Sequence, residues 1–201
     1  MTANGTNGTG GVPPTPSHTV GPFYGYALPF RGGEEIAPLG HPDTITVHGY
    51  VLDGAGAPVP DAFLEVWGAD PEGNVPAVDG SMRRDPAGGG HLGRNGVEFT
   101  GWGRAGTDAD GHWFARTLRP GARGRGAPYL SVCVFARGLL VHLFTRIYLP
   151  EDTAAHAADP LLARLDGERR ATLVARDEGR ATYRFDIRLQ GEGETVFLEY
   201  Q

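Results

Sequence analysis

Hydrophobic residues gather in short runs, and the longest nearly uninterrupted run covers residues 127–149. Pro128 and Gly138 bracket its first half, which is rich in β-branched and aromatic side chains and favours a buried central strand. After a short turn at Arg137-Gly138, a second strand over about 141–149 is expected to pair beside the first. The run therefore predicts two adjacent strands inside a sheet.

Alternating polar and apolar positions predict further half-buried strands, at residues 44–51, 62–67, 112–117, 182–189 and 195–200. In the first of these, Ile45, Val47 and Val51 share one face. A turn at residues 53–56 is expected to bring residues 62–67 back as the second strand of a hairpin.

Residues 70–106 show no sustained period and are predicted as a long loop. Asp159 and Pro160 have the chemistry of an N-cap and a first helical position, and the leucines after them predict one short helix that ends near Gly167. The fold class predicted from these elements is all-β, an antiparallel β-sandwich with long loops and one short helix.

The N-terminal part of the chain lacks this patterning. Residues 1–14 contain almost nothing to bury and are expected to be disordered, whereas residues 15–42 form an arm with aromatic residues set among Pro and Gly. The arm either caps its own core, which its composition favours, or reaches into a partner. Residues 43–201 are expected to form a single β-sandwich domain.

Composition narrows the class of protein. A net charge of −6 argues against a broad nucleic-acid or anionic-membrane surface. A single Cys excludes an internal disulfide and a cysteine metal cage. No window reaches the roughly 18 apolar residues of a membrane span, and the N-terminus lacks the pattern of a signal peptide. We expect a soluble, cytoplasmic protein.

The residues alone show no catalytic set. The chain contains no Gly-x-Ser-x-Gly, His-x-x-x-His or Cys-x-x-Cys motif, and its seven His residues are scattered singly. His48 lies on the polar face of its strand and is expected to be solvated rather than a ligand. Asp108 and Asp110 resemble the start of a calcium loop, but the remaining ligands are missing and a turn is favoured.

Several motifs in order resemble the intradiol ring-cleavage dioxygenases, from about Thr15 to the C-terminus. Residues 15–24 (Thr-Pro-Ser-His-Thr-Val-Gly-Pro-Phe-Tyr) resemble the family's N-terminal arm, residues 46–67 its opening hairpin and residues 107–121 its middle segment. The Phe-Ala-Arg-Gly that begins at Phe135 resembles in particular the alpha chain of a two-chain member of the family. The resemblance implies a β-sandwich that takes part in ring cleavage.

Catalytic members of this family hold a non-haem Fe(III) ion with two Tyr and two His residues. The matching stretches here are Gly73 to Val75, Ala122-Arg123, and Tyr129 to Ser131. By this alignment all four ligand positions are lost, and one phenol with one hydroxyl does not hold Fe(III) tightly. The resemblance therefore implies no metal on this chain, Fe(III) on a homologous beta chain, and a higher αβ oligomer.

The resemblance also carries over substrate-binding positions. Thr19, Gly21 and Pro22 match the arm residues whose backbone lines the cavity over the partner's iron, and Arg137 matches a guanidinium that attracts the carboxylate of protocatechuate. For Arg137, a turn residue in a surface ion pair is an equally good interpretation. Phe23 stands where many relatives carry Tyr.

The activity implied by the resemblance is cleavage of protocatechuate with O2 to 3-carboxy-cis,cis-muconate, catalysed by the assembled enzyme and not by this chain alone. The alternative is a transthyretin-like binding or structural sandwich without an enzyme. The predicted hairpin fits that alternative, whereas the arm and the Arg137 motif count against it. A stand-alone hydroxyquinol or catechol enzyme is disfavoured by the missing ligands.

Overall fold

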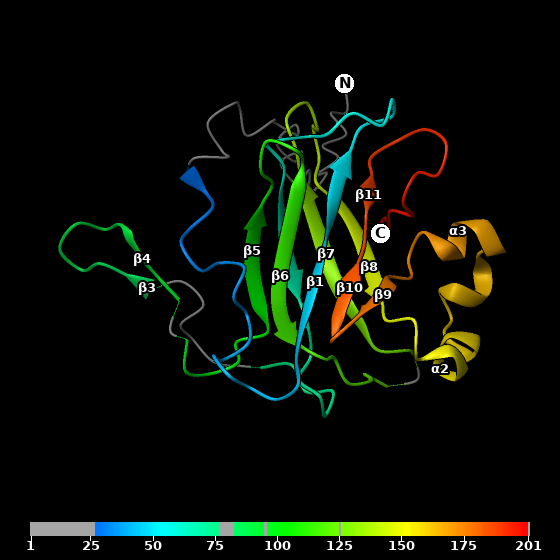
Figure 1. Cartoon of the computed structure of the whole chain (residues 1–201), viewed down its shortest axis with the longest axis horizontal. Helices are drawn as coiled ribbons and strands as arrows, with labels where there is room; N and C mark the ends of the chain where they lie inside the picture. The colour runs from blue at the N-terminus through cyan, green and yellow to red at the C-terminus, as the bar shows by residue number, and fades with distance from the viewer. Residues whose placement is uncertain (1–26, 77–82, 95, 125, 201) are drawn as a thin grey trace, which may run out of the picture.

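The chain folds into two stacked β-sheets in a computed structural model that describes residues 27–76, 83–94, 96–124 and 126–200 (Figure 1). The expected tail and residues 15–26 of the expected arm lie outside these residues. One sheet, which we call the second sheet, consists of β5 (Trp102–Gly106), β2 (Phe63–Trp67), β7 (Tyr129–Phe135) and β8 (Leu143–Tyr148), in this spatial order. The two predicted strands within residues 127–149 are β7 and β8, which pair antiparallel as expected.

The first sheet is built around β1. Its strands are β1 (Thr44–Leu52), β6 (His112–Leu118), β9 (Arg176–Gly179), β10 (Thr182–Arg184) and β11 (Ile187–Arg188). β6 runs antiparallel to β1 on one side, whereas β10 and β11 run parallel to it on the other. The all-β sandwich is thus confirmed, with these parallel pairs inside an otherwise antiparallel architecture.

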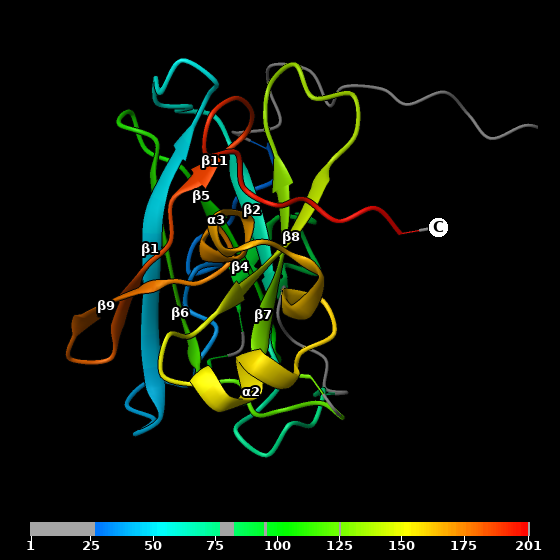
Figure 2. The ribbon, with the colours of Figure 1, turned by 90° about the vertical axis from the view of Figure 1, so that its right-hand side faces the viewer.

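The main core lies between the two sheets, which Figure 2 shows edge-on with β1 and β7 in different layers. Val47 and Val51 of β1 and Leu130 and Val132 of β7 are at most 1% exposed. Because side chains alternate between the faces of a strand, the residues between them on β7 point to the outer face of the second sheet. That outer face carries the candidate site described below.

The expected hairpin of residues 44–51 and 62–67 is wrong. β1 and β2 belong to different sheets, and the connection between them makes only one isolated bridge, from Leu52 to Pro58. Pro58 and Pro60 lack the N–H group that a continuing ladder needs. The chain therefore leaves the first sheet at this point and crosses to the second.

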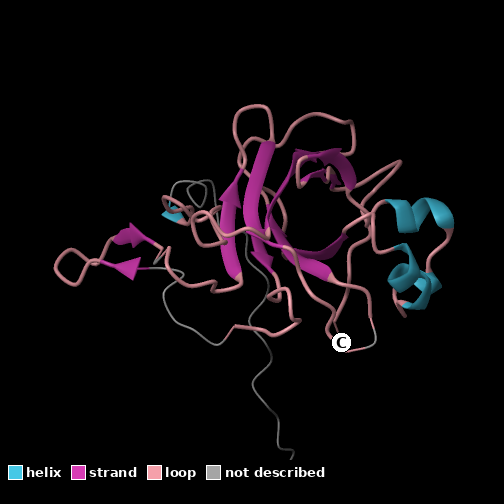
Figure 3. Ribbon diagram, turned by 60° about the horizontal axis from the view of Figure 1, so that its bottom comes forward, coloured by secondary structure: helices cyan, strands magenta, loops and turns pink. Residues whose placement is uncertain are grey.

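The predicted long loop at residues 70–106 contains strands that the pattern did not reveal. Its end forms β5, an edge strand whose two glycines hide the alternation, and its middle forms the short ribbon of β3 (Arg83–Arg84) and β4 (His91–Gly93). This ribbon projects to one side of the sandwich, opposite the helical region of residues 153–171 (Figure 3). The last predicted strand, at residues 195–200, is wrong, because the segment makes only the isolated bridge of Leu198 to Phe144.

The helical region is also more divided than expected. It consists of α2 (Thr153–Ala158), the 3₁₀ turn η1 (Leu162–Arg164) and α3 (Gly167–Ala171), so that Gly167 begins a helix rather than ending one. Asp159 accepts hydrogen bonds from the N–H groups of Leu161 and Leu162, as an N-cap does, but the turn it starts is 3₁₀. None of the helices in the described ranges is long and apolar enough to cross a membrane.

A second, smaller group of buried side chains lies under these helices. We call it the satellite cluster, and its buried members are Ala127, Tyr148, Leu162, Leu173 and Val196. It joins the helical region to β8 and to the C-terminal segment. Asp159 is 1% exposed within it and accepts hydrogen bonds from the Ala127 N–H group and the Tyr148 hydroxyl.

Candidate functional site

A cavity of about 580 Å³ opens on the outer face of the second sheet, where β2 ends and β7 begins. Two indoles form one wall, since Trp67 and Trp102 are directly opposite each other on β2 and β5, with ring centroids 6.3 Å apart. Tyr129 and Ser131, two residues apart on the outer face of β7, line the other wall. We call this space the sheet-end cavity.

The four positions aligned with the family's iron ligands meet at the sheet-end cavity. Val75, Arg123, Tyr129 and Ser131 all line it, although they come from two loops and one strand. Residues from all three aligned stretches therefore line one cavity.

Glycine lets the two loops approach each other. The Gly121 N–H group donates to the Asp70 carbonyl at 2.8 Å, and a Cβ atom on Gly121 would lie 2.2 Å from the Pro71 carbonyl oxygen. Gly73 has a φ of +85°, and a Cβ atom there would lie 2.2 Å from the Ala122 carbonyl oxygen. Larger residues would push the loops apart and open the cavity wall.

A row of side chains crosses the sheet through the cavity. Trp67 lies opposite Ser131, and Ser131 lies opposite Arg146 on β8. The Arg146 guanidinium lies 4.0 Å from the centroid of the Tyr129 ring, and its Nη1 donates to the Tyr148 hydroxyl at 3.2 Å. Arg146 is therefore a cation in contact with the Tyr129 ring, which itself lines the cavity.

The ionisation states around this row follow from burial and from Arg146. Burial raises the pKa of Tyr148 to about 12, although the hydrogen bond from Arg146 acts in the opposite direction. Burial alone would lower the pKa of Arg146, but the Tyr148 hydrogen bond and the nearby phenols raise it overall. At neutral pH the phenol is neutral and the guanidinium is charged.

The residues at this site do not fit an Fe(III) ion. Val75 offers no donor atom, Arg123 is a permanent cation, and Tyr129 and Ser131 supply one oxygen each. Within the described part of the chain, no group of three or more His, Cys, Asp or Glu side chains is arranged to hold a metal ion. The described lining of the sheet-end cavity therefore lacks the donor set that Fe(III) needs.

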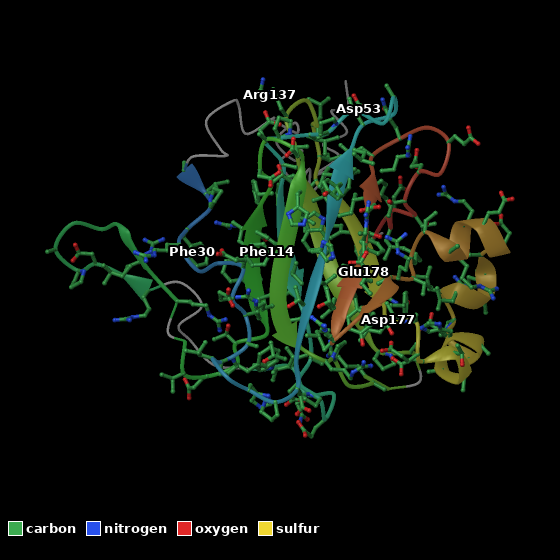
Figure 4. All side chains as sticks on the ribbon, in the orientation of Figure 1. Phe30, Asp53, Phe114, Arg137, Asp177 and Glu178 are labelled. Atoms are coloured by element: carbon green, nitrogen blue, oxygen red, sulfur yellow. The ribbon has the colours of Figure 1, made fainter. Side chains whose placement is uncertain are left out.

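Arg137 does not belong to this cavity. It follows the far end of β7, which is roughly 20 Å long at about 3.3 Å per residue. Its guanidinium pairs with Asp61, and its side chain is 65% exposed. Figure 4 shows it at the end of the sandwich that also carries Asp53. The arm positions Thr19, Gly21 and Pro22 lie outside the described residues.

Two histidines that looked isolated in the sequence meet in the fold. His48 Nδ1 lies 3.1 Å from His112 Nε2, and His48 Nε2 lies 2.9 Å from a Glu178 carboxylate oxygen, on the outer face of the first sheet. The antiparallel register of β1 and β6 pairs His112 with Tyr50, which makes His48 its diagonal neighbour. Sequence spacing does not reveal such a pair, because the strand pairing creates it.

Solved structures identify the class of protein. The dioxygenase domain of a dioxygenase carbohydrate-binding protein fusion from Streptomyces sp. SirexAA-E superposes with a TM-score of 0.55 and 26% identity, over 89% of this chain and 99% of that one. An intradiol ring-cleavage dioxygenase from Tetranychus urticae gives a TM-score of 0.57 over 85% and 91% of the chains at 16% identity, a likeness of fold. The fold is that of the intradiol dioxygenases.

Curated relatives narrow this class. The alpha chain of protocatechuate 3,4-dioxygenase from Burkholderia cepacia is 40% identical over 202 residues, which cover 92% of this chain and 96% of the relative. The alpha chain from Pseudomonas putida is 37% identical over 210 residues, with 94% and 98% covered. The Burkholderia cepacia beta chain is 31% identical over 196 residues, with 83% and 78% covered. No family model matches the chain. The chain belongs to the protocatechuate 3,4-dioxygenase alpha-chain family.

Proposed function

We propose that the chain is the iron-free alpha subunit of a protocatechuate 3,4-dioxygenase. A homologous beta chain holds the Fe(III) ion, and the assembled αβ oligomer cleaves protocatechuate with O2 between its two hydroxylated carbons. The product is 3-carboxy-cis,cis-muconate. The bound iron supplies the activation of the catecholate for attack by O2.

One observation carries this proposal. The sheet-end cavity stands where the family's iron site stands in the alignment, yet Val75 and Arg123 occupy two of its four ligand positions. An Arg side chain places a positive charge where a trivalent cation would need anionic donors. The chain is up to 40% identical to alpha chains and also 31% identical to a beta chain. These identities fit a subunit that arose by gene duplication and then lost its metal ligands.

In the assembled enzyme, residues of this chain then form part of the substrate site on the beta chain. The arm positions Thr19, Gly21 and Pro22 line the substrate cavity over the partner's iron, and Arg137 attracts the substrate carboxylate. The exposure of Arg137 supports this role, since a side chain that is 65% exposed in the lone chain is available to another chain. Cys133, which is buried and unpaired, supports a location in the reducing cytoplasm.

Expression of the chain alone and together with the partner beta chain tests this assignment. We expect the lone chain to bind no stoichiometric iron and to cleave no protocatechuate, whereas the copurified pair does both. Iron content and the loss of protocatechuate absorbance are the measurements. Stoichiometric iron and ring cleavage by the lone chain would contradict the proposal. A chain that never copurifies with a beta chain would instead fit the alternative of a binding module.

The role of Arg137 is tested in the assembled enzyme. We expect Arg137→Ala to raise the KM for protocatechuate about tenfold or more, which is the effect of losing one charge-assisted hydrogen bond. Arg164→Ala, which removes an exposed arginine from η1, is the matched control and should leave KM unchanged. Unchanged KM and kcat in Arg137→Ala would mean that Arg137 forms only its ion pair with Asp61 and does not act on the substrate.

A further inference from the structure

The sheet-end cavity has the size and lining of a small-molecule site. Its volume of about 580 Å³ lies within the roughly 300–1,000 Å³ of ligand pockets in proteins. The Trp67 and Trp102 indoles form an apolar wall, and Trp67 remains 40% exposed although Val66, the residue before it in β2, is buried. The two indole planes are inclined at 53° to each other, so a planar ring stacks on one of them, and the more exposed Trp67 is the better placed.

The polar groups at this cavity favour an anion with hydroxyl groups. Arg123 makes no ion pair or hydrogen bond to any described residue. The hydroxyls of Tyr129 and Ser131 likewise have no hydrogen-bond partner in the described part of the chain, so both are available to a ligand. No acidic residue is among the described residues that line the cavity.

A second cation adds to this preference. Arg146 lies behind the Tyr129 ring, its hydrogen bond goes to a neutral phenol, and its Nε atom is buried without a partner among the described residues. No carboxylate of the described ranges therefore neutralises its charge. One guanidinium group, of Arg123, thus lines the cavity, and a second, of Arg146, contacts the Tyr129 ring that lines it.

We propose that the sheet-end cavity binds a planar aromatic carboxylate of the hydroxybenzoate class and holds it without turnover. The ring stacks on the Trp67 indole beside Trp102, the carboxylate faces Arg123, and the Tyr129 and Ser131 hydroxyls meet the ring hydroxyl. This is a site on the chain itself and needs no metal ion. The proposed site does not depend on the proposed function, in which the reacting substrate lies over the partner's iron.

Titration of the full-length chain with 4-hydroxybenzoate tests this site. The probe carries one ring hydroxyl and is not a substrate for cleavage between two hydroxylated carbons. We expect one binding event per chain by calorimetry and quenching of tryptophan fluorescence, since two of the three Trp residues line the cavity whereas Trp113 is 1% exposed in the core. Absence of both signals up to millimolar probe would overturn the proposal.

Variants separate specific binding from general attraction. Arg123→Glu and Trp67→Ala should each weaken binding about tenfold or more, through loss of a charge-assisted contact and of a stacking wall. Arg164→Glu introduces the same charge change on η1 and should bind as the parent does. Equal weakening by Arg164→Glu would mean attraction by net charge alone and would overturn the proposal.

Two further probes define the ligand class. 4-Hydroxybenzamide keeps the ring and removes the charge, and cis,cis-muconate keeps the charge and removes the ring. Both should bind about tenfold more weakly than 4-hydroxybenzoate. If muconate binds equally well, the cavity recognises acyclic acids and the aromatic assignment fails. In the copurified αβ complex, Arg123→Glu should remove one 4-hydroxybenzoate site per pair and leave the site on the iron-bearing chain.

Discussion

At the scale of single residues, burial determines which groups of this chain can ionise or react. Cys133 lies on the outer face of β7 but is only 3% exposed, because its neighbours across the strands cover it. Burial, together with the nearby Glu65 carboxylate, raises the pKa of the thiol to about 12. The thiolate, which is the reactive form, is therefore scarce at neutral pH.

We accordingly expect Cys133 to resist thiol reagents in the folded chain. Labelling with Ellman's reagent at about pH 8 should be slow in native buffer and complete within minutes in denaturant, because only unfolding exposes the thiol and restores its ordinary pKa. The measurement is the absorbance of the released chromophore over time. Rapid stoichiometric labelling of the native chain would contradict the burial seen here.

Glu151 forms a small network of a different kind. Its carboxylate accepts hydrogen bonds from Arg119 and from the Tyr183 hydroxyl, which link the end of β6 and the start of the helical region to β10. Burial alone would raise the pKa of Glu151, but these two hydrogen bonds lower it below the ordinary value of 4.5. A lowered folded-state pKa means that the carboxylate stabilises the fold above pH 4.5 and loses this effect as pH falls through the folded pKa.

Glu151→Gln should therefore lower the free energy of unfolding at neutral pH by up to about 1 kcal/mol, a limit set by the partial exposure and screening of the pair. The difference from the parent should shrink as pH falls below 4.5. Urea unfolding across this pH range is the measurement. Glu192→Gln, an exposed carboxylate in the C-terminal segment, is the control and should show no such trend. A constant difference at every pH would argue against the network.

At the scale of elements, the decisive contact is the close approach of the β10–β11 segment to β1. Phe185, between those two strands, donates its N–H to the His48 carbonyl at 2.7 Å. A Cβ atom on Gly49 would lie 1.9 Å from the Phe185 carbonyl oxygen. Gly49 leaves the space that the Phe185 backbone occupies, and the parallel pairing on both sides of it depends on that space.

Gly49→Ala should destabilise the chain by about 3 kcal/mol, since backbone rather than a flexible side chain must move. Gly106→Ala in β5 is the matched control, because its new Cβ would meet only Pro29 at ordinary contact distances of 3.7 Å and more. The control should stay within about 0.5 kcal/mol of the parent. Urea midpoints measure both. Equal stability of Gly49→Ala and the parent would contradict the close approach.

Most elements were predictable from the sequence because periodicity is local. The alternation of Tyr183, Phe185 and Ile187 correctly identified buried positions, which are at most 3% exposed. Strand partners were less predictable. The hairpin of β1 with β2 was wrong because the same alternation fits either sheet of a sandwich, and β5 was missed because its glycines remove the signal.

The candidate site was predictable in part for a similar reason. Ordered motifs pointed to three stretches that align with the family's iron ligands, and residues from all three stretches line one cavity. The wall residues Trp67 and Trp102 and the cation Arg146 were not identified, since only the strand register places them next to Ser131.

At the scale of the whole molecule, the chain has one main core and one dependent region. The main core joins both sheets, whereas the satellite cluster holds the helices against β8 through few large side chains. Regions with smaller cores open more readily than the global fold. The helical region is therefore expected to open before the sandwich does.

Two leucine truncations test this division. Leu130→Ala, in the main core, should cost about 2–5 kcal/mol and speed amide exchange in both sheets. Leu162→Ala, in the satellite cluster, should speed exchange chiefly at residues 153–171 and leave β1 and β7 protected. Both side chains are fully buried at 0% exposure, which makes them a matched pair. Identical exchange patterns in the two variants would mean that the chain has a single cooperative core.

The parallel pairing of β1 with the C-terminal strands has a consequence for synthesis in the cell. The Tyr50 N–H group donates to an Asp186 carboxylate oxygen that lies 136 residues later in the chain. At about 5–20 residues per second, β1 leaves the ribosome many seconds before its neighbours β10 and β11 exist. Until then one side of β1 is an unpaired edge that can join other chains. Completion of the first sheet therefore waits until β10 and β11 have left the ribosome, and during that interval the exposed edge of β1 favours association between nascent chains.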